Sequence, residues 1–366
     1  SGTYFPPPVL RVEIPKAGGG KRPLGIPTVG DRIAQMTVRS LLEPVVEPCF
    51  HPDSYGYRPG KSAIQAVNQA RKRCWKYDWV IDLDIKGFFD NLDHNLMMKA
   101  VRFHTKSRLI LLYIERWLKA PVQYEDGRTE AREKGTPQGG VISPLLANLF
   151  LHYAFDNWMK RKHPLNPFEK YADDIIVHCR TETEARRLKD RIEQRLAECY
   201  LTLHPEKTKI IYCKDASRRG RKRNVFFDFL GFTFRPRRCK SRGGKLFVGF
   251  NPAVSRKAIL KMHQKLRKMN IPRCSGRSLK QLADFLNPVL RGWINYYGSF
   301  HKSAMYPFLY RVNRVILRWA KRKFKRFRSA PRRARKWLAR VSNFEENLFA
   351  HWQWGAKPDG WTMGTV

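Results

Sequence analysis

The chain has 366 residues, 42% of them hydrophobic, so it is long enough to bury the cores of two or three domains. Lysine and arginine number 72 against 31 aspartate and glutamate residues, and the net charge of +41 indicates a polyanionic partner, with nucleic acid favoured over an anionic membrane surface. No stretch approaches the ~18 consecutive apolar residues of a membrane span, and no signal peptide opens the chain. The seven cysteines are widely spaced without a C-x-x-C pair, which argues against a zinc ribbon or a disulfide scaffold and favours a reducing compartment.

The first predicted element is a basic hairpin, after a proline-rich and extended lead-in over residues 1–10. Val12 and Ile14 alternate with polar residues, a glycine turn follows, and Leu24 and Ile26 resume the pattern, which predicts two paired strands. The cations that flank the turn are Lys16, Lys21 and Arg22. Such a hairpin is either an ordinary charged hairpin or, through its exposed backbone amides, a grip for a triphosphate.

Two helices are predicted next. The first covers residues 31–42 and ends before Pro44. Its apolar face is expected to consist of Ile33, Met36 and Leu41. The second begins at a capping box formed by Ser62 and Gln65. The loop before it, residues 58–61, sets two cations beside the helix N-terminus, which makes the loop a phosphate contact or a plain cap.

An acidic strand follows at residues 80–85, with Asp82 and Asp84 facing the same way. Buried carboxylates on one strand face need partners or a metal ion, so either residue is a candidate ligand. Phe89 lies in the turn after the strand and either packs in the core or forms the wall of a nucleotide pocket. A helix is expected to begin near Asp93.

A tight loop is predicted at residues 137–140, where Gln138 is either a turn side chain or a hydrogen-bonding group near a bound nucleotide. Ser143 is expected to cap the next helix, with Pro144 at the first helical position. One face of that helix is predicted to contain Leu145, Leu149, His152 and Phe155.

An acidic hairpin is predicted around Tyr171-Ala172-Asp173-Asp174, because a short strand precedes this tetrapeptide and the strand-forming run Ile175 to Val177 follows it. Two adjacent carboxylates at a turn repel each other, and a divalent cation would relieve that repulsion. Aspartate is also common in solvated turns, so the tetrapeptide alone leaves both interpretations open.

Downstream of this hairpin the sequence predicts a helix capped by Thr181 and Glu184, a strand that carries Lys207 and Lys209, and a hairpin with Gly231. Near residue 250 the chain becomes helical and strongly basic. Aromatic residues alternate with cations there, a composition that suits RNA or single strands but also fits an ordinary amphipathic helix. We expect the aromatic side chains mainly to pack and the cations mainly to bind phosphate.

Seven blocks in order resemble those of reverse transcriptases, namely KRPLGIP, YGYRPGKSA, DIKGFFD, GTPQGGVISPLLANLFL, YADD, LHPEKTK and FLGFTF. The resemblance is closest to the bacterial reverse transcriptase/maturase proteins of group II introns, and RGWINYYGSF with the basic tail resembles their thumb, or X, domain. It implies an α+β fold of the right-hand polymerase type. Fingers and palm, with an antiparallel palm sheet, would occupy residues 1–250, a helical thumb/X domain residues 251–340, and a C-terminal tail residues 341–366.

The resemblance also implies roles for individual residues. Two Mg²⁺ ions would be held by Asp84, Asp173, Asp174 and the backbone of Ile85, and the family pattern favours Asp84 over Asp82. Residues that match the nucleotide-binding positions are Lys21, Arg22, Phe89 as the steric gate against a 2′-hydroxyl, Gln138 and Lys207. The primer grip would be Phe229, Leu230 and Gly231. The RNA-binding residues would be Arg291, Trp293, Arg311, Arg314, Arg318, Lys321 and Arg322.

The implied function is RNA-directed DNA synthesis, coupled to binding of a parent group II intron RNA for splicing and mobility. The expected partners are that RNA, an RNA template with a DNA primer, dNTPs and a DNA target, in the bacterial cytoplasm or at the nucleoid and without a membrane. Only about twenty residues precede KRPLGIP and no Cys/His-rich module follows, so we expect a short N-terminal extension and no endonuclease domain. The alternatives are a non-catalytic RNA-binding maturase and a relative used in DNA repair or phage defence.

Overall fold

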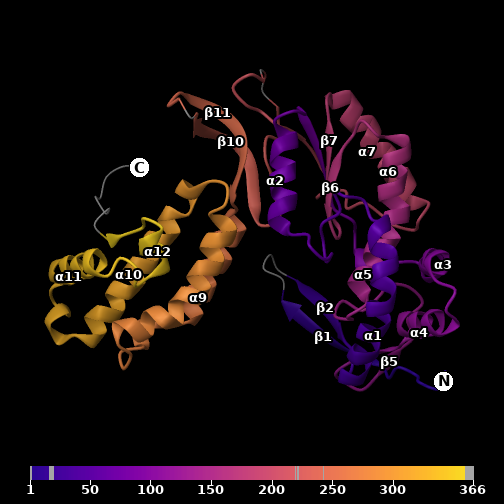
Figure 1. Cartoon of the computed structure of the whole chain (residues 1–366), viewed down its shortest axis with the longest axis horizontal. Coiled ribbons are helices and arrows are strands. Elements are labelled where there is room, and N and C mark those ends of the chain that lie inside the picture. The colour runs from indigo at the N-terminus through magenta and orange to yellow at the C-terminus, as the bar shows by residue number, and fades with distance from the viewer. Residues whose placement is uncertain (1, 16–19, 219, 221, 242, 359–366) are drawn as a thin grey trace. The chain divides into compact units, whose positions relative to one another are not determined.

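The computed structural model describes residues 2–15, 20–218, 220, 222–241 and 243–358 (Figure 1). The chain forms two compact units, Ser1–Val225 and Phe226–Val366. The division comes before residue 250, because the strands β9 (Phe227–Phe229), β10 (Phe232–Lys240) and β11 (Leu246–Val254) group with the helices that follow them. Both units contain sheets and helices, which confirms the α+β class.

The first unit is built on a four-stranded antiparallel sheet of order β6-β7-β3-β8. Its strands are β3 (Trp79–Leu83), β6 (Phe168–Tyr171), β7 (Asp174–Cys179) and β8 (Lys209–Tyr212). Every residue of β7 after Asp174 is buried, so both faces of this strand are covered. The covering helices α2 (Ala63–Cys74) and α7 (Glu182–Ala197) lie on opposite sides of the sheet (Figure 1). Both begin at the predicted capping boxes.

A second sheet of order β2-β1-β4-β5 contains the basic hairpin. Its strands are β1 (Val9–Pro15), β2 (Lys21–Ile26), β4 (Val122–Gln123) and β5 (Thr129–Glu130). β1 and β2 pair antiparallel, as predicted, with Leu10 opposite Ile26. Residues 16–19 of the turn and the side chain of Arg22 lie outside the described residues.

The remaining helices of this unit pack into one core with the central sheet. They are α1 (Val29–Val46), α3 (His94–His104), α4 (Arg108–Lys119), α5 (Ser143–Leu151) and α6 (Asn157–Lys162). Short helical turns are η1 (Glu47–Cys49) and η2 (Phe88–Asp90), and a π-helical segment, η3 (His152–Asp156), joins α5 to α6. Helix α3 begins next to Asp93, as predicted, and the Asp93 side chain caps it.

Helix α1 differs from the prediction in its end and in its buried face. It continues through Pro44 to Val46, so the predicted stop was wrong. The predicted apolar face is exposed: Ile33, Met36 and Leu41 are 65%, 49% and 60% accessible. The buried face consists of Asp31, Gln35, Val38, Leu42 and Val46. Polar residues can occupy this face because they are paired; the Gln35 side-chain oxygen accepts from the Val141 amide at 2.7 Å.

Ser143 was also assigned wrongly, because it lies inside α5 rather than capping it. Its buried Oγ accepts a hydrogen bond from Thr136 Oγ1 at 2.8 Å, and no side chain caps this helix. Pro144 does lie in the first turn, where a missing N–H is tolerated. The four residues predicted to share one face, Leu145, Leu149, His152 and Phe155, are all buried.

The second unit contains the antiparallel sheet β11-β10-β9 and five helices among its described residues. The helices are α8 (Arg256–Lys268), α9 (Leu279–Tyr297), α10 (Tyr306–Lys323), α11 (Pro331–Phe344) and α12 (Ala350–Gln353). Short turns are η4 (Ile271–Arg273), η5 (Lys302–Ala304) and η6 (Lys325–Phe327). Ser255 and Ser278 cap α8 and α9. Within the described parts of both units, helices with the length and apolarity needed for a bilayer crossing are absent.

Candidate active site

The acidic hairpin forms as predicted. It places two of the three candidate aspartates at one edge of the central sheet, where β6 ends and β7 begins. Tyr171 of β6 pairs with Asp174 of β7, so Ala172 and Asp173 form the turn between them. Ala172 adopts a left-handed conformation with φ 55°. A hairpin turn this short commonly needs positive φ, which explains the strained alanine.

Asp84 reaches the same edge from the neighbouring strand. β3 pairs antiparallel with β7, and Leu83 lies opposite Ile175. One step along both strands therefore brings Asp84 level with Asp174. Asp82 lies deeper in the sheet, opposite Ile176 and Lys209. The register thus favours Asp84 over Asp82 as the partner of the hairpin carboxylates.

The three carboxylates interact electrostatically. Desolvation, together with the charges of Asp173 and Asp84, raises the pKa of Asp174 from 3.8 to about 6. A nearby divalent cation would favour the charged form and reverse this effect. Oxygen ligands of this kind suit Mg²⁺, which takes one or two protein carboxylates and completes its shell with water and phosphate. Among the described residues, however, no three His, Cys, Asp or Glu side chains already form a metal cage. The charges fit the ion, and its coordination would depend on substrate and water.

Asp84 is held by residues that are distant in the sequence. Lys207 Nζ lies 3.3 Å from Asp84 Oδ2, and the His204 amide donates to the Asp84 carbonyl at 2.7 Å. Lys207 is 59% exposed, so its ammonium lies at the open edge of the sheet. The predicted nucleotide contact and the predicted metal ligand are therefore direct neighbours. Ile85 is buried and bridges Leu203, and its role as a backbone ligand stays a prediction.

Residues 53–56, which were not predicted to belong to the site, pack against the acidic hairpin. The Lys170 amide donates to the Asp53 carbonyl at 3.0 Å, and the Tyr55 amide donates to the Lys170 carbonyl at 2.7 Å. Gly56 then lies directly against the turn: a Cβ placed on it would be 2.5 Å from the Ala172 nitrogen. This contact leaves no room for a side chain at position 56.

Two buried ion pairs lie beneath the hairpin, and both were missed. Lys170 Nζ donates to Asp156 Oδ2 at 2.7 Å, with both side chains essentially inaccessible. On the adjacent residue, Glu169 accepts from His178 and from Arg73, each at 2.6 Å. The sequence did contain a signal for these ion pairs, namely the two charged residues Glu169 and Lys170 inside the short strand. Charged residues that are buried in a sheet require partners.

The loop at residues 58–61 has a structural role. The Arg58 side chain is 6% exposed; its Nη2 pairs with Glu47 at 2.7 Å and its Nη1 donates to the carbonyls of His51 and Ser54. Lys61 Nζ donates to the Pro52 carbonyl at 2.9 Å. The phosphate-contact interpretation is therefore wrong for Arg58, and the plain-cap interpretation holds.

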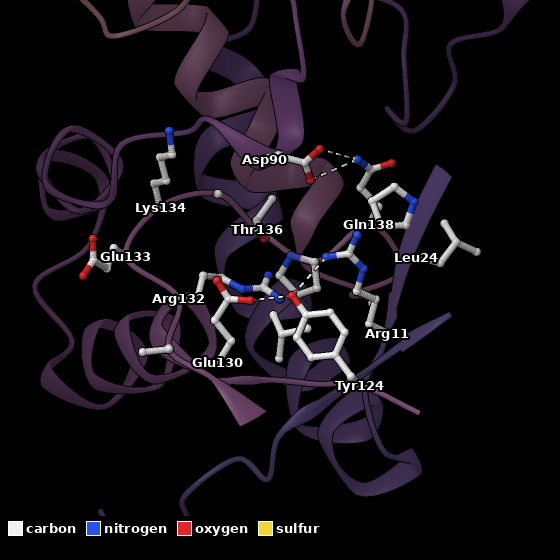
Figure 2. Close-up of a pocket in the computed structure, with 16 residues that line it drawn as sticks. Arg11, Leu24, Asp90, Tyr124, Glu130, Arg132, Glu133, Lys134, Thr136 and Gln138 are labelled. Carbon is white, nitrogen blue, oxygen red and sulfur yellow. Dashed lines mark hydrogen bonds between the residues drawn. The ribbon is translucent and has the colours of Figure 1, made fainter. Parts of the chain in front are cut away.

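Gln138 faces an open cavity of about 750 Å³ between the basic hairpin and residues 130–138 (Figure 2). Its Nε2 donates to the two carboxylate oxygens of Asp90 at 3.2 and 3.3 Å. The loop is fixed by close backbone packing, since a Cβ on Gly139 would be 2.4 Å from the Gly25 carbonyl oxygen.

The other predicted nucleotide contacts differ in exposure. Phe89 is buried and packs edge-on against Phe88 with ring centroids 5.3 Å apart. Lys21 is exposed and pairs with Glu13 at 2.9 Å. Lys21 is thus accessible to an anionic ligand, whereas the Phe89 ring is enclosed by its neighbours.

The predicted primer-grip residues lie in the second unit, at the turn between β9 and β10. Leu230 and Gly231 both have positive φ, at 49° and 82°. Tyr296 Oη donates to the Leu230 carbonyl at 2.8 Å, and a Cβ on Gly231 would touch the Tyr297 ring at 3.2 Å. Helix α9 therefore fixes the shape of this turn.

The predicted RNA-binding residues divide by exposure. Arg291, Arg314, Arg318 and Arg322 are exposed, whereas Arg311 and Lys321 are partly buried. Trp293 is half-buried and packs against Phe308, with ring centroids 5.3 Å apart. Trp319 and Phe327 are buried in the core of the unit. The expectation that aromatic side chains mainly pack is confirmed.

Comparison with known proteins gives two family matches. Residues 14–234 match the model described as reverse transcriptase (RNA-dependent DNA polymerase), and residues 259–338 match the group II intron maturase-specific domain. Protein YkfC of Escherichia coli K12 is 32% identical over 286 residues, which cover 68% of this chain and 71% of YkfC. The group II intron-encoded protein LtrA of Lactococcus lactis is 41% identical over 152 residues, covering 41% of this chain but only 25% of LtrA. The telomerase of Candida albicans superposes with a TM-score of 0.49 at 12% identity, covering 99% of this chain and 65% of the telomerase.

Proposed function

Since the chain belongs to the reverse transcriptases and carries the maturase-specific domain of group II introns, we propose that it copies RNA into DNA and binds the RNA of such an intron. The observation that carries the catalytic part is the register that brings Asp84 level with Asp174 beside the Asp173 turn. We assign fingers and palm to residues 1–250, the thumb/X domain to residues 251–340 and a tail to residues 341–366.

Each residue at the sheet edge has a distinct task in this proposal. Asp84, Asp173 and Asp174 would hold Mg²⁺, with the backbone of Ile85 assisting. Two bound Mg²⁺ ions would stabilise the attacking primer oxygen and the leaving pyrophosphate oxygen of an in-line displacement. Lys207, already beside Asp84, would exchange that carboxylate for a phosphate oxygen of the incoming nucleotide.

The remaining contacts would select and orient the nucleotide. Lys21 would leave Glu13 to contact the triphosphate, together with Arg22. Gln138 would give up its hydrogen bond to Asp90 and bind the incoming nucleotide instead. Phe89 would exclude a 2′-hydroxyl by its bulk. Phe229, Leu230 and Gly231 would position the primer end through their rigid turn.

The test is dNTP incorporation on an RNA template with Mg²⁺, comparing wild type with Asp173→Asn. We expect the variant to lose activity about a thousandfold, equal to about 4 kcal/mol of barrier, because the charge that holds the ion is removed without a change in volume. Asp190→Asn is the control, since that carboxylate is 69% exposed on α7. An inactive wild type would leave only an RNA-binding maturase, and equal activity in wild type and Asp173→Asn would exclude the proposed metal site.

The RNA-binding part rests on the second unit. Residues 226–366 contain 32 of the 72 lysine and arginine residues but only five of the 31 acidic residues. Arg314, Arg318 and Arg322 lie exposed along α10, so this helix presents a cationic face. Affinity for intron RNA should therefore fall steeply with salt, and a flat salt response would contradict the proposal.

A further inference from the structure

A strongly cationic cavity lies within the second unit. It has a volume of about 840 Å³ and is open to solvent. Six of its eight lining residues are cations, and none is acidic. They come from four segments: Arg267, Arg273, Arg318, Lys321, Arg322 and Arg328. Only three of them belong to the RNA-binding set that the family resemblance implies, so the cavity defines a different group of residues.

The walls of the cavity are rigid. Helix α10 is anchored to the segment after η4 by Trp319 Nε1, which donates to the Cys274 carbonyl at 2.8 Å. Trp319 and Ile271 are completely buried. Asn270, at the mouth of this turn, has a left-handed conformation with φ 47°. The cationic side chains therefore project from a fixed frame, which lowers the ordering cost of binding a ligand.

The cations carry no internal counter-charge. Within the described residues, none of the six forms an ion pair with a carboxylate. Helices α8 and α10 end at Lys268 and Lys323, so their C-terminal dipoles partly offset the repulsion near Arg267 and Arg322. That offset is a fraction of a charge at each helix end, and it leaves most of the repulsion in place. An anionic ligand would relieve it.

We infer that this cavity binds closely spaced backbone phosphates of a folded RNA, at a point where the strand turns sharply. A single phosphate uses two or three cationic contacts, so six cations call for several phosphates together. Regular duplex presents evenly spaced phosphates on a convex cylinder, whereas a sharp strand turn gathers phosphates into a projecting cluster that a concave site can enclose. This inference rests on the proposed function, because it names the feature of the intron RNA that the second unit would grip.

The test compares binding of two RNAs to the full-length chain over a range of salt concentrations. One RNA is a three-way junction with sharp backbone turns, and the other is a perfect duplex with the same number of phosphates. The cavity variant is Arg273→Gln/Arg322→Gln. The control is Arg332→Gln/Arg333→Gln on α11, which removes the same charge from exposed positions outside the cavity. A thermal melt of each variant checks that it remains folded.

We expect the cavity variant to bind the junction at least tenfold more weakly and to lower its salt slope by about 2, one for each lost phosphate contact. Binding of the duplex and the behaviour of the control should change much less. The inference is overturned if the control loses as much affinity as the cavity variant, if the junction slope is unchanged, or if the duplex is weakened equally. Should Arg273→Gln/Arg322→Gln fail to fold, Arg328→Gln provides the same comparison with an expected slope change of about 1.

Failure of the proposed function gives a different result. Extension of a short DNA primer on an unstructured RNA template depends on the sheet edge of the first unit, so Arg328→Gln, which changes a cavity residue outside the predicted RNA-binding set, should retain it. Absence of this extension in wild type would refute reverse transcription while leaving the comparison of junction and duplex binding valid.

Discussion

Replacing Gly56 by alanine tests whether the segment beneath the acidic hairpin sets the position of Asp173 and Asp174. A Cβ at this position would be 2.5 Å from the Ala172 nitrogen and 3.0 Å from the Tyr171 carbonyl carbon. Ordinary contact begins at 3.4 Å, so the turn and the Gly56 backbone must separate by about 0.9 Å. Both contacted atoms are backbone atoms, which cannot rotate away.

The size of the effect follows from this displacement. Overpacking of a tight site costs about 1–3 kcal/mol of folding free energy. A misplacement of about 1 Å at a catalytic group lowers turnover by about a hundredfold. We therefore expect Gly56→Ala to remain folded with a modestly reduced free energy of unfolding, and to lose about two orders of magnitude in kcat. The KM for dNTP should change far less, because Gln138 is held by Asp90 and Lys21 by Glu13.

The assay is steady-state dNTP incorporation on an RNA template, paired with urea unfolding of the same preparations. Gly30→Ala is the matched control: its Cβ would meet only Thr28 Oγ1 at 4.0 Å, and it lies in α1 away from the hairpin. Gly56 does not set the position of the hairpin if Gly56→Ala keeps wild-type kcat, or if its activity falls only in proportion to the fraction unfolded.

Three further predictions concern the surroundings of the hairpin. Burial, together with the charge of Lys170, lowers the pKa of His152 from 6.5 to about 4, so the folded state resists a proton that the unfolded state accepts. As the pH falls from 6.5 to 4, wild type should therefore lose up to about 3 kcal/mol of unfolding free energy that His152→Gln does not lose. Urea unfolding measures this difference, and parallel pH curves for the two proteins would contradict it. The pKa of Asp174 is raised, so the folded state keeps the proton of this carboxyl to a higher pH than the unfolded state does. In EDTA, the free energy of unfolding should therefore fall by about 1 kcal/mol, after allowance for solvent screening, as the pH rises from 4 to 6. At pH 8, Mg²⁺ should raise the Tm of wild type but not of Asp174→Asn, and an equal response of the two proteins would refute the assignment of Asp174 as a metal ligand. Ala172→Gly should raise the Tm by relieving about 1 kcal/mol of left-handed strain, whereas Ala172→Val should lower it. A lower Tm for Ala172→Gly would argue against the strain.

Features that depend on neighbouring residues could be predicted from the sequence. The capping boxes at Ser62, Thr181 and Ser278 each satisfy backbone amides three residues away, so their signal is local. The acidic hairpin is equally local, because its strands are joined by a two-residue turn. Family resemblance then supplied Asp84, and the register of β3 against β7 gives a physical reason for that choice over Asp82.

Features that depend on residues far away in the sequence could not be predicted. The buried face of α1 includes Gln35 because its side chain meets the Val141 amide, 106 positions away, whereas the apolar spacing favoured the opposite face. Lys170 is buried because η3 brings Asp156 to it, and nothing near Lys170 in the sequence indicates that pairing. The cationic cavity combines four separate segments, so composition revealed its charge but not its location.

The π-helical segment η3 has a consequence for how this region can change. A π-turn holds one more residue than an α-turn, and each residue advances an α-helix by about 100°. Inserting one more residue within His152–Asp156 would exceed the single extra residue that the π-turn absorbs, and would rotate the Asp156 carboxylate by about 100° away from Lys170 Nζ. That would leave a buried ammonium without a counter-ion directly below the acidic hairpin, which is far more costly than most substitutions there. The length of this stretch, rather than its composition, is therefore the property on which the arrangement beneath the acidic hairpin depends.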